Sequence, residues 1–176
     1  MGYSADKEIL TIISWGPHDG DRQEESRRRA FRKYDQMGKP LHALSQTEAR
    51  ELAEQYPLKR GRGGSMGWQK AFVISLVGFL SEHDLSMAEF RRALTQMPPL
   101  LAQTVLQTAL GTSSTKIPHC YMRDCLKLDA FPIDRRVARL LNRFHVPLDP
   151  WVVISSCRRL GIPVRVLARA AYRMGE

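Results

Sequence analysis

The sequence predicts an all-α protein, and three observations support this prediction. Two capping boxes of the form S-x-x-E, at Ser45 to Glu48 and at Ser86 to Glu89, mark helix starts. Apolar residues recur at helical spacing in two stretches, at 117, 121, 125 and 128 and at 137, 140, 141 and 144. The strict apolar and polar alternation of strands is nearly absent. We therefore expect amphipathic helices, each with one buried face.

The first half of the chain is predicted to hold five helices and two loops. The loop "GPHDGD" at 16–21 separates a first helix from a very basic second helix that contains "SRRRAFRK" at 26–33. A third helix starts at Ser45, and the basic, glycine-rich stretch "KRGRGGSMG" at 59–67 reads as a linker. The apolar run 71–80 is too short to span a bilayer and predicts a core helix, and a further helix starts at Ser86.

The second half contains further helix boundaries. A hairpin, "GTSST" at 111–115, precedes a helix that begins near Lys116. Asp134 follows Pro132 and predicts the N-cap of the next helix. Asp149 and Pro150 predict another helix start, and Gly161-Ile162-Pro163 predicts a helix stop followed by a new start.

Composition restricts the class of protein. A length of 176 residues suits one compact domain or two small helical lobes, and a net charge of +9 with a pI near 9.9 favours a polyanionic partner. Three cysteines without paired spacing argue against a disulfide framework or a zinc site, and they predict buried small residues in a reducing compartment. The start "MGYSADKE" lacks the apolar core of a secretory leader. We expect an intracellular monomer with no membrane partner, no metal and no cofactor.

Lys116 and Asp134 are the strongest candidates for a catalytic pair. The 18 positions between them allow one helix and a return loop, which can bring an amine and a carboxylate together. The hydroxyl groups and backbone N–H groups of the hairpin lie where the helix begins, which favours a bound phosphate. Taken singly, Asp134 is more often an N-cap and Lys116 more often a solvated lysine, so the prediction depends on their spacing.

These residues carry a resemblance to a known family. Leu110, the hairpin Gly111 to Thr115, Lys116 and "AFPIDRRV" at 130–137 resemble the helix-hairpin-helix superfamily of DNA glycosylases, and "AFPID" is most similar to its 8-oxoguanine branch. "SMGWQKAFVISLVGFL" and "RRALTQMPPLLAQTVLQTALGT" are similar to the helices that precede the family hairpin. The four-cysteine loop that holds an iron–sulfur cluster in some relatives has no counterpart here.

The resemblance implies a fold and an activity. It implies one glycosylase-like domain over residues 1–176, with its hairpin at 110–116 and a groove between two helical lobes that divide near 59–67. It implies an enzyme in DNA repair, a glycosylase with AP lyase activity, acting on double-stranded DNA that contains a damaged base or an abasic site. An oxidised purine such as 8-oxoguanine is the expected lesion, and the protein is expected with DNA in the cytoplasm or nucleus.

The chemistry follows from the residues that this family uses. A base inside a duplex is out of reach, so the nucleotide must be flipped into a pocket. Lys116, as a neutral amine, would attack C1′ of the sugar and form a Schiff base, and Asp134 would stabilise the developing positive charge or take a proton. The Schiff base would permit strand cleavage by β-elimination.

Further residues are candidates for DNA contact. Gly111, Thr112, Ser113, Ser114 and Thr115 are expected to bind phosphate. Arg135 and Arg136 are equally well explained as phosphate ligands or as part of the solvated face of a helix. Aromatic rings commonly stack on a flipped base, so the base-pocket candidates are Trp15, His119, Phe131 and Trp151, each of which is also compatible with a core position.

Two departures from the family pattern keep alternatives open. Thr112 and Ser114 stand where the family hairpin has glycines, so the positive φ that glycine adopts easily is lost. "SWGPHDGD" stands where relatives have an intercalating segment. The alternatives are a monofunctional glycosylase for alkylated bases or uracil, and a non-catalytic helix-hairpin-helix module that binds DNA.

Overall fold

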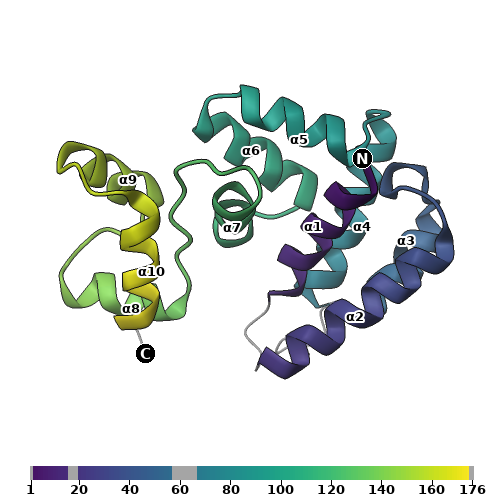
Figure 1. Cartoon of the computed structure of the whole chain (residues 1–176), viewed down its shortest axis with the longest axis horizontal. Helices are drawn as coiled ribbons and strands as arrows, with labels where there is room; N and C mark the ends of the chain where they lie inside the picture. Colours follow the sequence, from purple (N-terminus) through teal and green to yellow (C-terminus); the bar gives the residue numbers. More distant parts are fainter. Residues whose placement is uncertain (1, 16–19, 57–66, 175–176) are drawn as a thin grey trace. The chain divides into compact units, whose positions relative to one another are not determined.

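The described part of the chain, residues 2–15, 20–56 and 67–174 of a computed structural model, is helical throughout and contains no strand (Figure 1). The all-α prediction is therefore confirmed. The elements in order are α1 (Gly2–Ser14), α2 (Gly20–Met37), the 3-10 helix η1 (Leu41–Ala43), α3 (Gln46–Ala53), α4 (Trp68–Glu82), α5 (Met87–Gln96), α6 (Pro99–Leu110), α7 (Lys116–Asp124), α8 (Arg135–Arg143), α9 (Pro150–Arg159) and α10 (Val164–Met174).

The chain divides into two compact units. The first contains Met1–Met97 and Thr104–Thr112, and the second contains Pro98–Gln103 and Ser113–Glu176. The division therefore falls inside α6 and inside the hairpin. The lobe division expected near 59–67 stays a prediction. Most of that stretch, and most of the loop predicted at 16–21, lie outside the described residues. The groove expected between two lobes stays a prediction.

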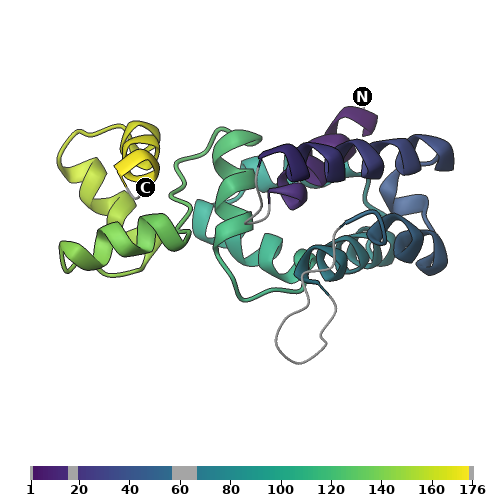
Figure 2. The same ribbon diagram turned by 90° about the horizontal axis from the view of Figure 1, so that it is seen from below.

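The first unit is built around α4, which packs against α3, α1 and η1 (Figures 1 and 2). Its core is aliphatic and aromatic, with fully buried side chains from every helix: Ile9, Leu10, Ile13, Tyr34, Leu52, Leu76, Leu80 and Phe90. Burying one such side chain stabilises the fold by about 1.5 to 3 kcal/mol. The apolar run predicted as a core helix accordingly lies within α4.

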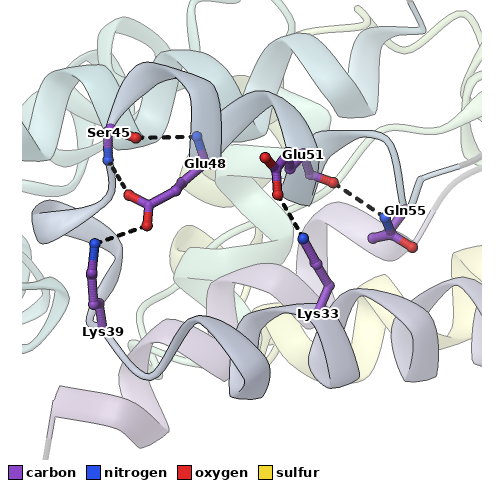
Figure 3. Close-up of polar contacts among 6 residues, drawn as sticks. All are labelled: Lys33, Lys39, Ser45, Glu48, Glu51 and Gln55. Carbon is purple, nitrogen blue, oxygen red and sulfur yellow. Dashed lines mark hydrogen bonds and ion pairs between the residues drawn. The ribbon is translucent and has the colours of Figure 1, made fainter.

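Ion pairs join α2 and the loop that follows it to α3 across the surface of the first unit (Figure 3). Lys33 Nζ lies 2.6 Å from Glu51 Oε2, and Lys39 Nζ lies 2.8 Å from Glu48 Oε1. Glu48 also accepts from the backbone N–H of Ser45, whose hydroxyl accepts from Glu48 N, so the predicted capping box is present. The second predicted capping box, at Ser86 and Glu89, is present too.

One buried carboxyl group ties three elements of this unit together. The Asp6 side chain is 1% exposed, and its Oδ2 accepts from Tyr34 OH of α2 and from Leu41 N of η1 at 3.2 Å. Burial raises the pKa of Asp6, although the two hydrogen bonds oppose that shift. The residue is a structural link between α1, α2 and η1.

The second unit ends in three helices, α8, α9 and α10, that enclose a small core (Figures 1 and 2). The predicted helix boundaries are confirmed here: Asp149 caps α9 with Pro150 as its first residue, and α10 begins directly after Pro163. Gly161 has φ +66°, which allows the sharp reversal between α9 and α10. The core residues of these helices are Val137, Leu141, Val153, Ile154, Cys157, Val164, Ala168 and Ala171, joined by Phe131.

The helical periodicity was wrong at one of its positions. Phe144 was predicted on the buried face of its helix, but its side chain is 71% exposed. The helix α8 ends at Arg143, His145 takes φ +54°, and Val146 N bonds to Leu141 O at 2.9 Å. In this helix-terminating turn the residue after the turn packs back on the helix. Val146 therefore packs against the core in place of Phe144.

Two searches of the described residues concern membranes and metals. No single helix there is long and apolar enough to cross a membrane, although α4 and α5 meet that criterion together as a pair bent by 87°. Within the same residues, no three His, Cys, Asp or Glu side chains are grouped as metal ligands would be.

Candidate functional site

The hairpin begins where α6 ends, and its first residue is held by both backbone and packing. Gly111 has φ +62°, its N–H bonds to Thr108 O at 3.0 Å, and Thr112 N bonds to Gln107 O at 2.9 Å. This pair of hydrogen bonds is the Schellman motif, which favours glycine at the position with positive φ. A Cβ atom on Gly111 would lie 2.6 Å from Ser75 Oγ and 3.2 Å from Ser75 Cβ of α4. Glycine is therefore required at 111 by conformation and by space.

The hairpin turns without glycine at positions 112 and 114, where the resemblance led us to expect it. The described residues with positive φ are Asp84, Lys127 and His145 besides three glycines, so Thr112 and Ser114 adopt ordinary backbone conformations. Their replacement of glycine therefore introduces no left-handed strain in this loop. Thr112 is half-buried, and Ser113 and Ser114 are exposed.

Lys116 is the first residue of α7. Its backbone N–H donates to Ser114 Oγ at 3.4 Å, and its side chain is half-buried. Thr115, the N-cap residue, has α-helical φ and ψ angles and gives no side-chain capping bond. The start of α7 thus depends on Ser114 rather than on Thr115.

Asp134 is the N-cap of α8, as its sequence position predicted. Its Oδ1 accepts from Arg136 N and from Val137 N, both at 2.9 Å. The carboxylate sits half-buried at the positive end of the helix. One carboxylate oxygen thus satisfies two N–H groups of the first turn of α8.

The two candidates act on one buried group, the thiol of Cys120 in α7. Burial raises the pKa of Cys120 to about 11. The charges of Arg123 and Lys116 oppose this shift, while the charges of Asp124 and Asp134 reinforce it. Lys116 and Asp134 therefore lie within electrostatic range of the same thiol, from two different helix starts of the second unit.

The second unit also contains a buried polar network centred on His119, which is 0% exposed. Its Nδ1 accepts from Phe131 N at 3.0 Å, so the proton is on Nε2, which donates to Gln103 Oε1 at 2.7 Å. Trp151 Nε1 donates to the same Gln103 oxygen at 2.7 Å. Burial lowers the pKa of His119 to about 4, so its ring is neutral at pH 7. The network fixes α6, α7, α9 and the segment before α8 to one another.

The remaining predicted site residues have different surroundings. His119 and Phe131 are fully buried, and Trp151 is partly buried with its N–H in use, so these rings contact protein in this conformation. Trp15 is half-buried and belongs to the first unit. Arg135 is exposed, and the Arg136 guanidinium lies 5.2 Å from the centre of the Tyr172 ring.

One residue of this region was missed by the sequence analysis. Gln103 lies near the start of α6, 16 positions before His119 and 48 before Trp151, and it joins both side chains. Nothing in the local sequence distinguishes Gln103 from the exposed glutamines of neighbouring helices. Its role depends on contacts that appear only when the helices pack.

No family model, no curated protein and no solved structure matches this chain. The assignment to a function therefore depends on the residues of the site.

Proposed function

We propose that the protein is a DNA repair glycosylase with AP lyase activity, which removes an oxidised purine such as 8-oxoguanine from double-stranded DNA. The observation that carries the proposal is that Lys116 begins α7 and Asp134 caps α8 in the same unit, and that both charges act on the buried Cys120 thiol. An amine and a carboxylate of this kind suit an attack on a sugar carbon and the stabilisation of the positive charge that develops there. The net charge of +9 supports a polyanionic partner.

The proposed reaction begins when the neutral amine of Lys116 attacks C1′ of the flipped nucleotide. The bond from C1′ to the purine nitrogen breaks, and its electron pair leaves with the base. The ammonium proton passes to the departing base or to the free oxygen of Asp134. Opening of the sugar ring leaves an imine between Lys116 and C1′. Loss of a proton from C2′ then expels the 3′ phosphate by β-elimination and cuts the strand.

The second carboxylate oxygen of Asp134, Oδ2, would take part in the proposed reaction. Its Oδ1 accepts the two N–H groups of α8, and these bonds orient the carboxylate. A carboxylate held in this way needs no reorganisation when charge develops nearby. Capping and catalysis are therefore compatible roles for one side chain.

The second candidate function is a non-catalytic DNA-binding module. The burial of His119 and Phe131 favours it, because two of the rings expected to stack on a flipped base face the protein interior. An enzyme would need this region to open when DNA binds. The two functions differ in one product, the covalent imine.

Borohydride trapping tests the proposal. Mixing the protein with a duplex that contains 8-oxoguanine or an abasic site and adding borohydride should link protein and DNA covalently, because the reductant converts the imine to a stable amine. Lys116→Gln should abolish the adduct while undamaged-duplex affinity changes by less than about threefold, since one charge of many is removed. Lys127→Gln is the matched control, because Lys127 is an exposed lysine at the far end of α7.

The carboxylate is tested with a matched pair of caps. Asp134→Asn keeps a capping oxygen, so helix stability should survive while base release falls by about 10²-fold or more. Asp149→Asn makes the same change at the cap of α9, where Oδ1 accepts from Trp151 N at 2.8 Å, and should leave base release unchanged. The same assays are run on a panel of oxidised, alkylated, uracil and abasic substrates. Duplex binding with no adduct and no base release on any of them would favour the non-catalytic binding module. Base release without an adduct would favour a monofunctional glycosylase.

A further inference from the structure

The last three helices carry an unusual charge distribution. Residues 134–174 contain nine arginines, no lysine and two aspartates, which gives this segment a formal charge of +7 against +9 for the whole chain. Both aspartates are helix N-caps, Asp134 of α8 and Asp149 of α9, and each bonds to backbone N–H groups. Both carboxylates of the segment therefore serve as helix caps.

The arginines lie in rows on the outer faces of two helices. On α10, Arg165, Arg169 and Arg173 are spaced four apart, and all three are exposed. Residues four apart lie on the same side of a helix, so the three guanidinium groups form one row opposite the buried Val164, Ala168 and Ala171. On α8, the arginines 135, 136, 139 and 143 lie opposite the buried Val137 and Leu141 in the same way.

A contact between the two helices joins these rows. The α8 and α10 helices pack against each other, and the guanidinium of Arg136 lies 5.2 Å from the ring centre of Tyr172. Tyr172 is three residues from Arg169 and is 48% exposed. The arginines of α8 and α10 therefore border one surface, which we call the arginine face: residues 135, 136, 139, 143, 165, 169 and 173, with Tyr172 between them.

The arginine face is locally unfavourable for the helices that carry it. Like charges four residues apart destabilise a helix, and three arginines follow that spacing in α10. Arg135 and Arg136 also lie in the first turn of α8, where the helix dipole is positive and disfavours cations. A solvated surface normally intersperses both signs of charge. A local cost of this kind is expected where a residue serves a partner.

We propose that the arginine face is a second DNA-binding surface, which holds the phosphate backbone of the duplex independently of the base that the enzyme removes. Guanidinium groups bind phosphate oxygens in pairs, and they match this geometry better than ammonium groups do. Phosphate contacts of this kind position a protein on DNA and carry no sequence information. The choice of duplex DNA as the polyanion rests on the proposed function, whereas the arginine face itself does not.

Salt dependence of binding tests the proposal on the full-length protein. An undamaged duplex of about 20 base pairs is titrated at several salt concentrations, and each arginine that neutralises a phosphate adds about 0.9 to the slope of log affinity against log salt. The triple variant Arg165→Gln, Arg169→Gln, Arg173→Gln should lower that slope by roughly 2 to 3 and weaken binding at low salt by at least about tenfold. These side chains are exposed, so the melting temperature should stay within a few degrees.

The matched control removes the same charge from the first unit. Arg27, Arg28 and Arg91 are ion-paired with Glu24, Glu24 and Glu8. Their joint replacement by Gln should change the slope by less than about 0.5. Equal slopes for the two triple variants would overturn the arginine face as a DNA surface. So would preserved duplex binding of the α10 variant combined with lost binding to vesicles rich in phosphatidylserine, which would assign the face to membranes.

Borohydride trapping separates this proposal from the proposed function. If the enzyme proposal fails and the arginine face is correct, no adduct forms on any lesion, but duplex binding remains steep in salt and depends on the α10 arginines. If the arginine face is wrong and the enzyme proposal is correct, the α10 variant keeps both its adduct and its salt slope.

Discussion

The two units of this protein differ in the charges and the apolar side chains that they expose. In the first unit, cations lie beside anions, as in the pairs Lys7–Asp35, Lys33–Glu51, Lys39–Glu48 and Arg91–Glu8 (Figure 3). The second unit also contains the pairs Arg123–Asp124 and Arg158–Asp129, but arginines predominate on α8 and α10, and Asp134 and Asp149 cap helices. Exposed large apolar side chains follow the same division, since all those found in the described residues belong to the second unit: Leu100, Leu101, Phe144, Leu148, Val152, Leu160, Ile162, Val166, Tyr172 and Met174.

This contrast favours the second unit as the part of the protein that binds a partner. A surface whose charges are paired and whose apolar groups are buried presents few groups that can bind a partner. A surface with one sign of charge and exposed apolar groups is typical of a binding surface. The arginine face and both catalytic candidates, Lys116 and Asp134, belong to the second unit, whereas Gly111 and Thr112 of the hairpin belong to the first.

The buried network of the second unit offers the largest expected effect on stability. Gln103→Leu removes the oxygen that accepts from His119 Nε2 and Trp151 Nε1, and it leaves two buried donors unpaired. Each unpaired donor costs about 1 to 3 kcal/mol, so the loss should be roughly 2 to 5 kcal/mol. Hydrogen exchange followed along the chain should show faster opening of α7 and α9, with α1 to α4 nearly unchanged.

The exposed glutamine at the end of α5 supplies the control for that measurement. Gln96→Leu makes the same chemical change without removing a buried acceptor, and stability should stay within about 0.5 kcal/mol of the parent. Equal protection of α7 and α9 in the Gln103 variant would show that the network contributes little. Equal loss of protection in α1 to α4 would show that the units do not unfold separately.

Acid should separate the two units in the next experiment. His119 has an ordinary pKa of 6.5 when unfolded and about 4 when folded, so between these values the unfolded chain binds a proton that the folded chain does not. The second unit should therefore lose stability as pH falls from 6.5 to 4, by roughly 3 kcal/mol in total. In the first unit the raised pKa of Asp6 acts in the opposite direction, because the folded form binds the proton of Asp6 before the unfolded form does as the pH falls toward the ordinary value of 3.8.

Urea denaturation at a series of pH values, with hydrogen exchange followed separately in each unit, measures how the stability of each unit changes with pH. His145→Asn removes an exposed histidine and should leave the profile of the second unit unchanged. A second unit whose stability is flat from pH 6.5 to 4 would rule out a neutral, buried His119 as the cause of acid sensitivity.

The smallest expected effect concerns the paired charges of the first unit. Glu51→Gln removes the anion 2.6 Å from Lys33, but the Glu51 side chain is 51% exposed, so the pair is solvated (Figure 3). The loss of stability should be about 0.2 to 1 kcal/mol and should shrink further in high salt. A loss well above this range, measured by thermal unfolding, would mean that the pairs hold α2 and α3 together rather than merely balance their charge.

Several features of the protein could be predicted from local sequence, because they depend on neighbouring residues. The capping boxes at Ser45 and Ser86, the caps at Asp134 and Asp149, and the stop at Gly161 each involve groups within a few positions, and all are present. The helical class followed from the same local signals. Phe144 was misplaced because helical periodicity does not say where a helix ends.

Tertiary structure alone decided the rest, because the deciding contacts join residues far apart in the chain. Gly111 meets Ser75 of α4, 36 positions away, so its need for space is invisible in the hairpin sequence. Gln103 becomes the acceptor for His119 and Trp151 only when three helices pack together. The arginine rows were visible as periodic positions, but their union into one face depends on the contact between Arg136 and Tyr172. Local sequence determines which segments become helices, whereas the burial of their apolar faces determines which side chains meet.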